Sequence, residues 1–282
     1  MNFLIASSTK ILGLLGYPLG HSISFYIHNK AFQVSSIDAI YLNIPISPEY
    51  FSEAIKGLKF LPIWGLNITV PFKEKIIEFL DELSETSKIL GAVNTVFVDD
   101  KGRWIGDNTD LPGFLKTIQE LNLNKDLPFL ILGAGGAARA VIYALIEYGV
   151  KNLFISNRTE EKADRLIEEV SDKKGFLIQK VLWKEKENLK EKLVLINTTS
   201  VGLDGKSNPW KGTLRNVVLV YDIIYNPFKT PIIFQAEEEK IPWKNGLDML
   251  IYQAAYSWER WFGILGPVDI MRREAFDIIC AS

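Results

Sequence analysis

A glycine-rich turn between an apolar run and a helical segment constrains the fold of this chain more than any other feature. Residues 133–138 read Gly-Ala-Gly-Gly-Ala-Ala and follow the apolar run 129–132 directly. This turn fits the G-x-G-x-x-A form of the dinucleotide fingerprint, in which Gly133 permits a tight turn and Gly135 lets a pyrophosphate approach the backbone. Ala138 is small enough for close helix–strand packing. The alternative is a glycine-rich turn without a ligand, but its position before a helix N-terminus favours phosphate binding. We therefore expect a cofactor to contact Gly133, Ala134, Gly135, Gly136 and Ala137.

Strand-like and helix-like segments alternate on the C-terminal side of this turn. Apolar runs typical of buried strands occupy residues 129–132, 153–156, 193–197 and 217–222, and helical patterns occupy residues 137–148 and 160–170. Such alternation predicts a parallel sheet that helices cover on both faces. An amphipathic helix at residues 111–121 leads into this unit.

The residues before this helix predict a second α/β unit. Strands are expected at residues 10–16, 41–44, 66–70, 95–98 and 103–105, and helices at 24–34, 48–58, 72–80 and 84–90. Residues 247–279 have a mostly helical pattern, and we expect them to pack back on this unit. The sequence thus predicts two α/β domains with a cleft between them. One comprises residues 1–110 plus 247–282 and binds the substrate, and residues 111–246 form a Rossmann-type domain.

Composition restricts the partners. The chain has 282 residues, 48% of them apolar, and a net charge of −2, so no global field recruits nucleic acid or an anionic membrane. Cys280 is the only cysteine, which favours a reducing compartment. The N-terminal run lacks the basic region of a signal peptide, and no apolar stretch approaches the ~20 residues that span a bilayer. His21 and His28, the two histidines, have no cysteine or acidic helpers close by for a usual metal site. We expect a cytoplasmic protein with a small-molecule substrate and without a metal.

The end of the second strand of the Rossmann-type domain indicates which dinucleotide binds. An NAD enzyme usually places an acidic residue there, whereas residues 156–159 read Ser-Asn-Arg-Thr. The guanidinium of Arg158 matches a 2′-phosphate, and Lys162 adds charge one turn into the helix. Glu160 and Glu161 suit the positive end of the helix dipole. A solvated surface charge is the alternative for Arg158. The sequence favours NADP as the cofactor.

A set of short motifs, in order along nearly the whole chain, resembles the shikimate dehydrogenases of the shikimate/quinate dehydrogenase family. The motifs are residues 16–24 (Gly-Tyr-Pro-Leu-Gly-His-Ser-Ile-Ser) with His28 and Asn29, 67–73 (Asn-Ile-Thr-Val-Pro-Phe-Lys), 91–95, 106–113, 157–159, 197–200, 225–227, 245–249 and Gln253. The resemblance implies reversible NADPH-dependent reduction of 3-dehydroshikimate to shikimate, in the shikimate pathway of aromatic amino-acid biosynthesis. One departure is Phe25, which stands where the family usually has a proline.

The resemblance also implies roles for individual residues. It assigns Ser22 and Ser24 to the substrate carboxylate, with Thr69 and Tyr225 nearby, although helix capping alone is the other interpretation of the serine pair. It assigns the ring hydroxyls to Asn67, Asn94 and Gln253. The further residues that it assigns to the cofactor are Asn157, Thr159, Thr199, Ser200, Gly246 and Met249.

Lys73 and Asp110 are the expected catalytic pair. Alcohol–ketone interconversion needs hydride transfer by the cofactor and proton transfer at the oxygen. The resemblance puts Lys73 at the reacting centre as acid/base and Asp110 as its orienting partner, and it gives neither His21 nor His28 a catalytic role. Both histidines are expected to be structural.

Two other functions stay open at this stage. One is a quinate/shikimate dehydrogenase with relaxed substrate or cofactor choice, and the other is a non-catalytic sensor of a shikimate-like metabolite. A monomer and a homodimer are both compatible with the sequence.

Overall fold

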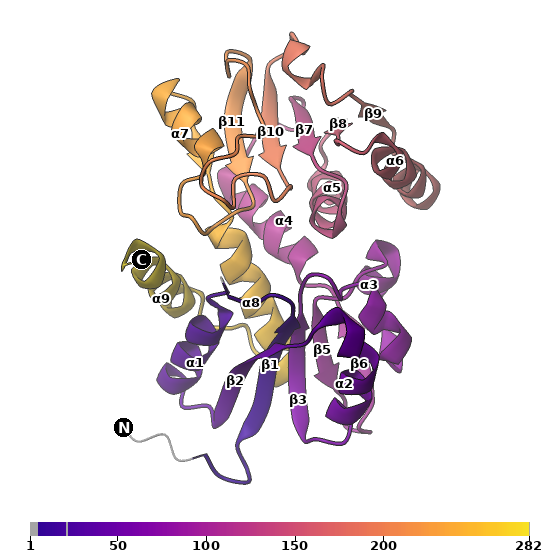
Figure 1. The fold of residues 1–282 in the computed structure, drawn as a ribbon, viewed down its shortest axis with the longest axis vertical. Coiled ribbons are helices and arrows are strands. Elements are labelled where there is room, and N and C mark those ends of the chain that lie inside the picture. The colour runs from indigo at the N-terminus through magenta and orange to yellow at the C-terminus, as the bar shows by residue number, and fades with distance from the viewer. Residues whose placement is uncertain (1–4, 21, 282) are drawn as a thin grey trace. The chain divides into compact units, whose positions relative to one another are not determined.

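The computed structural model describes residues 5–20 and 22–281, and the chain folds into two compact units (Figure 1). Unit 1 comprises Met1–Thr109 and Gln253–Ser282, and unit 2 comprises Asp110–Tyr252. In the described part of the chain no helix is both long and apolar enough to cross a membrane.

Unit 1 contains a mixed six-stranded sheet with the order β2-β1-β3-β5-β6-β4. β1 runs parallel to β2 and β3, whereas β5 is antiparallel to both β3 and β6. The strands are β1 (Lys10–Gly16), β2 (Ala39–Pro45), β3 (Ile63–Ile68), β4 (Glu82–Leu83), β5 (Thr95–Val98) and β6 (Trp104–Asp107). The helices are α1 (Ser24–Val34), α2 (Phe51–Leu58), α3 (Glu85–Leu90) and α9 (Val268–Ala281), together with the part of α8 (Leu247–Phe262) from Gln253 onward.

The outer edge of β2 is occupied by a side chain from α1. Asn29 Oδ1 accepts from the backbone N–H of Tyr41 at 2.9 Å, and Asn29 Nδ2 donates to the Tyr41 carbonyl at 2.9 Å. The amide therefore satisfies both outward-facing backbone groups of Tyr41, as a neighbouring strand would. Pro45, four residues after Tyr41, faces the same edge and has no N–H.

His28 lies in an aromatic layer of unit 1 and is fully buried. The indole N–H of Trp258 donates to His28 Nδ1 at 2.9 Å, and the imidazole stacks on Tyr41 with 4.3 Å between ring centroids. Burial lowers the pKa of His28 to about 3, so the ring is neutral. This packing agrees with the structural role expected for His28, while His21 lies outside the described residues.

The segment expected to form a helix at residues 72–80 differs from the prediction. It contains a 3₁₀ helix, η2 (Lys75–Phe79), and no α-helix. The carbonyl of Lys73 accepts from the Val93 N–H at 2.8 Å and so is not used for an α-helical bond to Ile77. Ile77 instead donates to Glu74, three residues back. Similarly, the first turn expected at residues 48–58 is the 3₁₀ helix η1 (Pro48–Tyr50).

Unit 2 contains the all-parallel sheet that the alternating pattern predicted, with the order β12-β11-β10-β7-β8-β9. Its strands are β7 (Pro128–Leu132), β8 (Asn152–Ser156), β9 (Ile178–Lys180), β10 (Leu193–Asn197), β11 (Val217–Asp222) and β12 (Trp243–Lys244). Its helices are α4 (Asp110–Leu121), α5 (Gly136–Tyr148), α6 (Glu160–Lys174) and α7 (Pro231–Glu238), with a 3₁₀ helix η3 (Lys186–Asn188). The strand order reverses between β7 and β10, which is where α/β sheets of this kind bind ligands.

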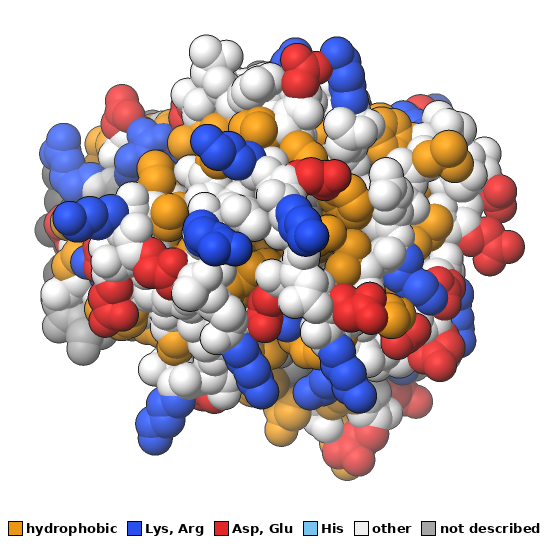
Figure 2. All heavy atoms as spheres, turned by 90° about the horizontal axis from the view of Figure 1, so that it is seen from above, with side chains coloured by type: hydrophobic (Ala, Val, Ile, Leu, Met, Phe, Trp, Pro, Cys, Tyr) orange, Lys and Arg blue, Asp and Glu red, His pale blue; other side chains and the backbone are white. Residues whose placement is uncertain are grey.

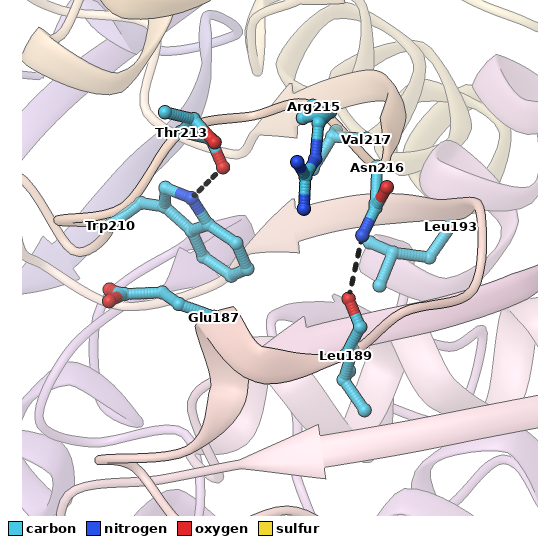
Figure 3. A pocket seen from close by; sticks show the side chains of 8 residues that line it. All are labelled: Glu187, Leu189, Leu193, Trp210, Thr213, Arg215, Asn216 and Val217. Carbon is cyan, nitrogen blue, oxygen red and sulfur yellow. Dashed lines mark hydrogen bonds between the residues drawn. The ribbon is translucent and has the colours of Figure 1, made fainter.

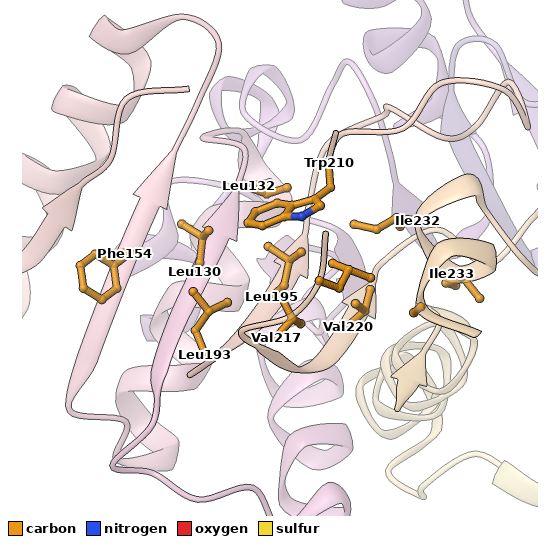
Figure 4. Packing of buried hydrophobic residues seen from close by; sticks show 12 residues of the cluster. Leu130, Leu132, Phe154, Leu193, Leu195, Trp210, Val217, Val220, Ile232 and Ile233 are labelled. Carbon is orange, nitrogen blue, oxygen red and sulfur yellow. The ribbon is translucent and has the colours of Figure 1, made fainter. Parts of the chain in front are cut away.

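Apolar side chains from the central strands form the core on one face of this sheet (Figure 4). Leu130 and Leu132 of β7, Leu195 of β10 and Val220 of β11 are buried together with Ile232 of α7. Trp210, from the loop before β11, packs into the same cluster. This core fixes the strands whose carboxyl ends carry the predicted cofactor residues.

Candidate active site

The carboxyl ends of β7 and β10 meet at Gly133. Gly133 has φ +113°, a conformation that side chains rarely adopt, and a Cβ there would lie 2.6 Å from Thr198 Oγ1. The backbone N–H and the hydroxyl of Thr198 both donate to the Leu132 carbonyl, at 2.8 and 2.7 Å. Only glycine fits between the two strand ends at this point.

No neighbouring atom packs beside the Cα atoms of the next two glycines. Gly135 is the N-cap of α5 and Gly136 its first residue, and a Cβ on either would meet nothing within 4 Å. Ala138, one turn into the helix, is fully buried against the sheet. Open backbone at a helix N-terminus is what an approaching pyrophosphate requires, so this turn fits a dinucleotide.

The tip of β8 presents an exposed cation. Arg158 and Lys162 are both exposed, and Asn157 Nδ2 donates to the Thr159 carbonyl at 2.7 Å, which holds the turn between β8 and α6. Lys180 Nζ lies 3.7 Å from Glu160 Oε2, so the carboxylate two residues after Arg158 already has a cation partner. The donor set at this tip therefore fits a 2′-phosphate, and with it NADP.

A buried carboxylate joins the loops that follow β10 and β11. Asp222 Oδ1 accepts from Asn197 Nδ2 at 3.0 Å and from the Ile224 N–H at 3.1 Å, and Asp222 Oδ2 accepts from the Thr230 hydroxyl at 2.6 Å. Asn197 Oδ1 in turn accepts from the hydroxyl of Thr199 at 2.7 Å. Burial raises the pKa of Asp222 to about 6. Sequence analysis did not select Asp222, because nothing in its neighbourhood indicates partners 8 and 25 residues away.

Asp222→Asn should remove a pH dependence of stability. A carboxyl whose pKa is raised in the folded state stabilises the fold fully below its unfolded pKa, and this contribution is lost as the pH rises through about 6. Asparagine keeps the shape, and the Thr230 hydroxyl can turn to accept from it. We expect the stability of the variant relative to the parent to rise by about 1 kcal/mol between pH 5 and pH 7.5. Urea unfolding at both pH values measures this, and a constant difference would show that Asp222 titrates normally.

The remaining residues predicted in unit 2 lie after β10, after β11 and at the start of α8. Tyr225 is mostly buried, and desolvation raises the pKa of its phenol to about 12, so it remains a neutral hydrogen-bond donor. A Cβ on Gly246 would lie 1.8 Å from the Ile223 carbonyl oxygen, so only glycine fits there. Met249 is buried and Ser200 is exposed.

Three predicted ring-hydroxyl residues of unit 1 belong to one polar network. Asn67 is 5% exposed, and its Oδ1 accepts from the Tyr41 hydroxyl at 2.8 Å. Asn94 Oδ1 accepts from the Thr109 N–H at 2.7 Å, and Asn94 Nδ2 lies 3.5 Å from Gln253 Oε1. The structure thus brings Asn67, Asn94 and Gln253 together.

The backbone also brings the two catalytic candidates to Asn94. Thr109, which donates to Asn94, is covalently joined to Asp110, so their Cα atoms are ~3.8 Å apart. The Lys73 carbonyl accepts from the N–H of Val93, the residue before Asn94. Lys73 is half-buried and Asp110 is 9% exposed. The backbones of both candidates are therefore held close to Asn94 along the chain, that of Lys73 through Val93 and that of Asp110 through Thr109.

The serine pair and Thr69 lie at the carboxyl ends of β1 and β3. Ser22 Oγ accepts from the Ser24 N–H at 3.3 Å, and Ser24, the first residue of α1, is buried. A Cβ on Gly16 would lie 2.3 Å from the Thr69 side chain, so the loop that leads to the serines begins against Thr69. The N-cap of α1 is Ile23, and among the described residues no side chain caps it, so the Ser22 contact is a local turn and not the helix cap of the other interpretation. The carboxylate role of the serines is left to experiment.

Ser22→Ala separates a carboxylate role from a structural one. A hydrogen bond to a charged group is worth about 1.5–3 kcal/mol, so loss of a carboxylate contact should raise the KM for shikimate about tenfold or more. The kcat should change less, because the contact is present in ground and transition states alike. Steady-state kinetics with parallel melting curves measure both effects. A lower Tm with an unchanged KM would restrict Ser22 to a structural role in the turn before α1.

Sequence analysis missed Ser257, which lies in the same network. Its hydroxyl accepts from Asn67 Nδ2 at 2.9 Å and donates to the Gln253 carbonyl at 3.0 Å. The one signal in the sequence is its spacing, because Ser257 follows Gln253 by four residues and so lies on the same helix face.

Unit 2 contains a small cavity that none of these residues lines (Figure 3). It is found where β10 and β11 begin, beside Leu193 and Val217, at the opposite end of the strands from Gly133. The indole N–H of Trp210 donates to the Thr213 carbonyl at its rim. Its volume of about 40 Å³ is far below that of cofactor pockets, so it is not the nucleotide site. Among the described residues no group of three or more His, Cys, Asp or Glu side chains could hold a metal ion.

Charges of both signs are mixed on the face of the molecule that Figure 2 shows. Lys and Arg side chains alternate there with Asp and Glu, and hydrophobic side chains appear between them. On this face the surface offers no broad field of one sign, in keeping with the net charge of −2.

Comparisons with known proteins agree with the motifs. Residues 14–96 match the profile of the shikimate dehydrogenase substrate binding domain, residues 116–202 that of shikimate/quinate 5-dehydrogenase, and residues 246–276 that of the shikimate 5′-dehydrogenase C-terminal domain. The shikimate dehydrogenase (NADP(+)) of Dictyoglomus turgidum is 61% identical over 272 residues, which cover 96% of this chain and 98% of the relative.

Solved structures show the same fold. A shikimate dehydrogenase in complex with NADP+ has a TM-score of 0.89 at 33% identity, with 98% of each chain covered. A quinate dehydrogenase from Corynebacterium glutamicum in complex with NAD has a TM-score of 0.87 at 27% identity, covering 95% of this chain and 99% of that chain. Identity of 61% over nearly the full length shows that the chain belongs to the shikimate dehydrogenases of the shikimate/quinate dehydrogenase family.

Proposed function

We propose that the chain catalyses the reversible, NADP-linked interconversion of shikimate and 3-dehydroshikimate. The observation that carries this proposal is the arrangement around Asn94, because the backbone holds the Lys73 and Asp110 segments close to it. An ammonium group and a carboxylate acting on one hydroxyl can hold and move its proton. The bound nicotinamide cofactor would supply the hydride chemistry.

In this proposal each polar residue has one task. Lys73 holds the reacting hydroxyl and exchanges its proton, and Asp110 orients Lys73. Asn67, Asn94 and Gln253 bind ring hydroxyls, and Ser22, Ser24, Thr69 and Tyr225 bind the carboxylate. In unit 2 the open turn at Gly135 and the cation at Arg158 support NADP as the dinucleotide.

A matrix of substrates and cofactors tests the proposed function. Shikimate and quinate are each incubated with NADP and with NAD, and the reduced nicotinamide is measured. We expect the largest kcat/KM for shikimate with NADP. Comparable rates with quinate or NAD would favour a quinate/shikimate dehydrogenase with relaxed choice. Binding of shikimate without turnover would favour a metabolite sensor.

The cellular setting belongs to the same proposal. A single cysteine suits a reducing cytoplasm, and a monomer or a homodimer would both be sufficient for the chemistry, because every proposed site residue is present in one chain.

A further inference from the structure

Three buried hydroxyl groups lie against one another in unit 1. Thr95 Oγ1 is 3.0 Å from both Thr109 Oγ1 and Ser257 Oγ, and the latter two are 3.2 Å apart. All three side chains are at most 1% exposed. We call Thr95, Thr109 and Ser257 the hydroxyl cluster. It touches the amides of both Asn67 and Asn94.

Backbone groups determine which way the two amides face, because a backbone N–H only donates and a carbonyl only accepts. The Thr109 N–H lies 2.7 Å from the Asn94 amide, so the group facing it must be Oδ1. The Asn94 carbonyl lies 3.2 Å from the Asn67 amide, so the group facing it must be Nδ2. Neither amide can be flipped without placing two donors or two acceptors against each other.

With the amides in these orientations, the donors and acceptors around the hydroxyl cluster are assigned, whereas in each of the three contacts within it either oxygen can be the donor. Asn67 Nδ2 donates to Ser257 Oγ at 2.9 Å and to Thr95 Oγ1 at 3.1 Å. The Ser257 hydroxyl donates a hydrogen bond to the Gln253 carbonyl at 3.0 Å. Thr95 and Thr109 donate to Asn94 Oδ1, at 3.0 and 3.2 Å. Asn94 Oδ1 is thus surrounded by donors, and the Asn94 NH₂ group faces away from the cluster, toward Gln253 Oε1.

We propose that the hydroxyl cluster holds the Asn94 amide with its NH₂ group toward the ligand, so that Asn94 donates a hydrogen bond to the substrate. We call this orientation the polarity of the amide. This inference rests on the proposed function, in which the ligand is a polyhydroxylated ring acid. A ring hydroxyl at Asn94 then accepts a hydrogen bond and must give its own hydrogen to another acceptor. Thr109 and Ser257 are positioning residues, because they act on the ligand through Asn94 and Asn67.

Asn94→Asp tests the polarity, because aspartate replaces the NH₂ group by an oxygen. It also adds a negative charge at a buried position, which lowers the Tm in either polarity, so Asn67→Asp serves as the reference. If Asn94 Oδ1 faces the hydroxyl cluster, aspartate at position 94 keeps every inward contact, whereas aspartate at position 67 loses the inward donor. The Tm should therefore fall less for Asn94→Asp than for Asn67→Asp, while the KM for shikimate rises about tenfold or more because the donor to the ligand is lost. An equal or larger fall in Tm for Asn94→Asp would overturn the inference.

Thr109→Val and Thr109→Ser test the positioning role. Valine keeps the shape without the hydroxyl, and we expect a five- to tenfold higher KM for shikimate, about the value of one neutral hydrogen bond, with a smaller change in kcat and an unchanged KM for NADP. Serine keeps the hydroxyl and should restore the KM. Ser87→Ala is the matched control, because Ser87 is fully buried and its hydroxyl has no hydrogen-bond partner among the residues that the structure describes.

The outcomes separate this inference from the proposed function. If the parent chain does not oxidise shikimate, the proposed function fails, while the Tm of Asn94→Asp still tests the amide polarity. If the parent is active and Thr109→Val has the KM of the parent, or shows the same loss as Thr109→Ser, the hydroxyl cluster is purely structural and the inference is overturned.

Discussion

Lys73→Ala should lower the kcat for shikimate oxidation by about 10²–10⁴-fold, the usual contribution of general acid–base catalysis. Lys73 is the proposed proton carrier, and its backbone is held next to Asn94 by the bond between its carbonyl and the Val93 N–H. Because that bond uses the backbone alone, alanine should leave the fold and NADP binding intact. Stopped-flow or steady-state kinetics with shikimate, together with separate titration of NADP, measure the two effects.

Asp110→Asn extends this prediction to a cycle of four proteins. Asparagine keeps the shape of Asp110 and removes its charge, so kcat should again fall strongly. Residues that act as a unit are non-additive, and the double variant should be far less impaired than the product of the single losses. A near-normal kcat in Lys73→Ala, or strictly multiplicative losses, would mean that the proton travels by another route.

Arg158→Ala should raise the KM for NADP about tenfold or more, since a charge-assisted phosphate contact is worth about 1.5–3 kcal/mol. Arg158 is exposed at the tip of β8, and the neighbouring Glu160 already has Lys180 as a cation partner. NAD has no 2′-phosphate, so its KM should hardly change. Arg165→Ala is the control, because Arg165 is exposed on α6, the helix that follows Arg158, and lies outside the predicted cofactor residues. Equal weakening of both cofactors would contradict the assignment of Arg158.

Helices and strands were predicted correctly where an apolar run or a helical period is visible among neighbouring residues. The apolar runs of β10 and β11 match the structure at both ends, and the periodic segment 24–34 is α1. β9 and β12 were missed because strands of three and two residues carry no usable period, and their identity depends on pairing with β8 and β11. The helix expected at residues 72–80 is shorter and is a 3₁₀ helix, because the distant N–H of Val93 donates to the Lys73 carbonyl.

In the candidate site, too, some residues are marked by a local motif and others are revealed only by distant contacts. Motifs in the sequence selected Asn94 and Gln253, and the structure places their amides 3.5 Å apart. Ser257 and Asp222 were not selected, because their importance depends on partners such as Asn67 and Asn197 that are distant along the chain. A residue that binds a ligand can be marked by a motif, whereas a residue that orients it is visible only through its hydrogen bonds.

The pairing of the Asn29 side chain with the edge of β2 affects whether this protein can aggregate at high concentration. An unpaired strand at the end of a sheet is a template on which another chain can extend the ladder, and such growth leads to aggregates. With Tyr41 paired to Asn29 and no N–H at Pro45, Asn43 is the residue of β2 left to offer an outward N–H. At the other end of the same sheet β4 has two residues. Any self-association of unit 1 should therefore proceed through side-chain surfaces and not through shared β-structure.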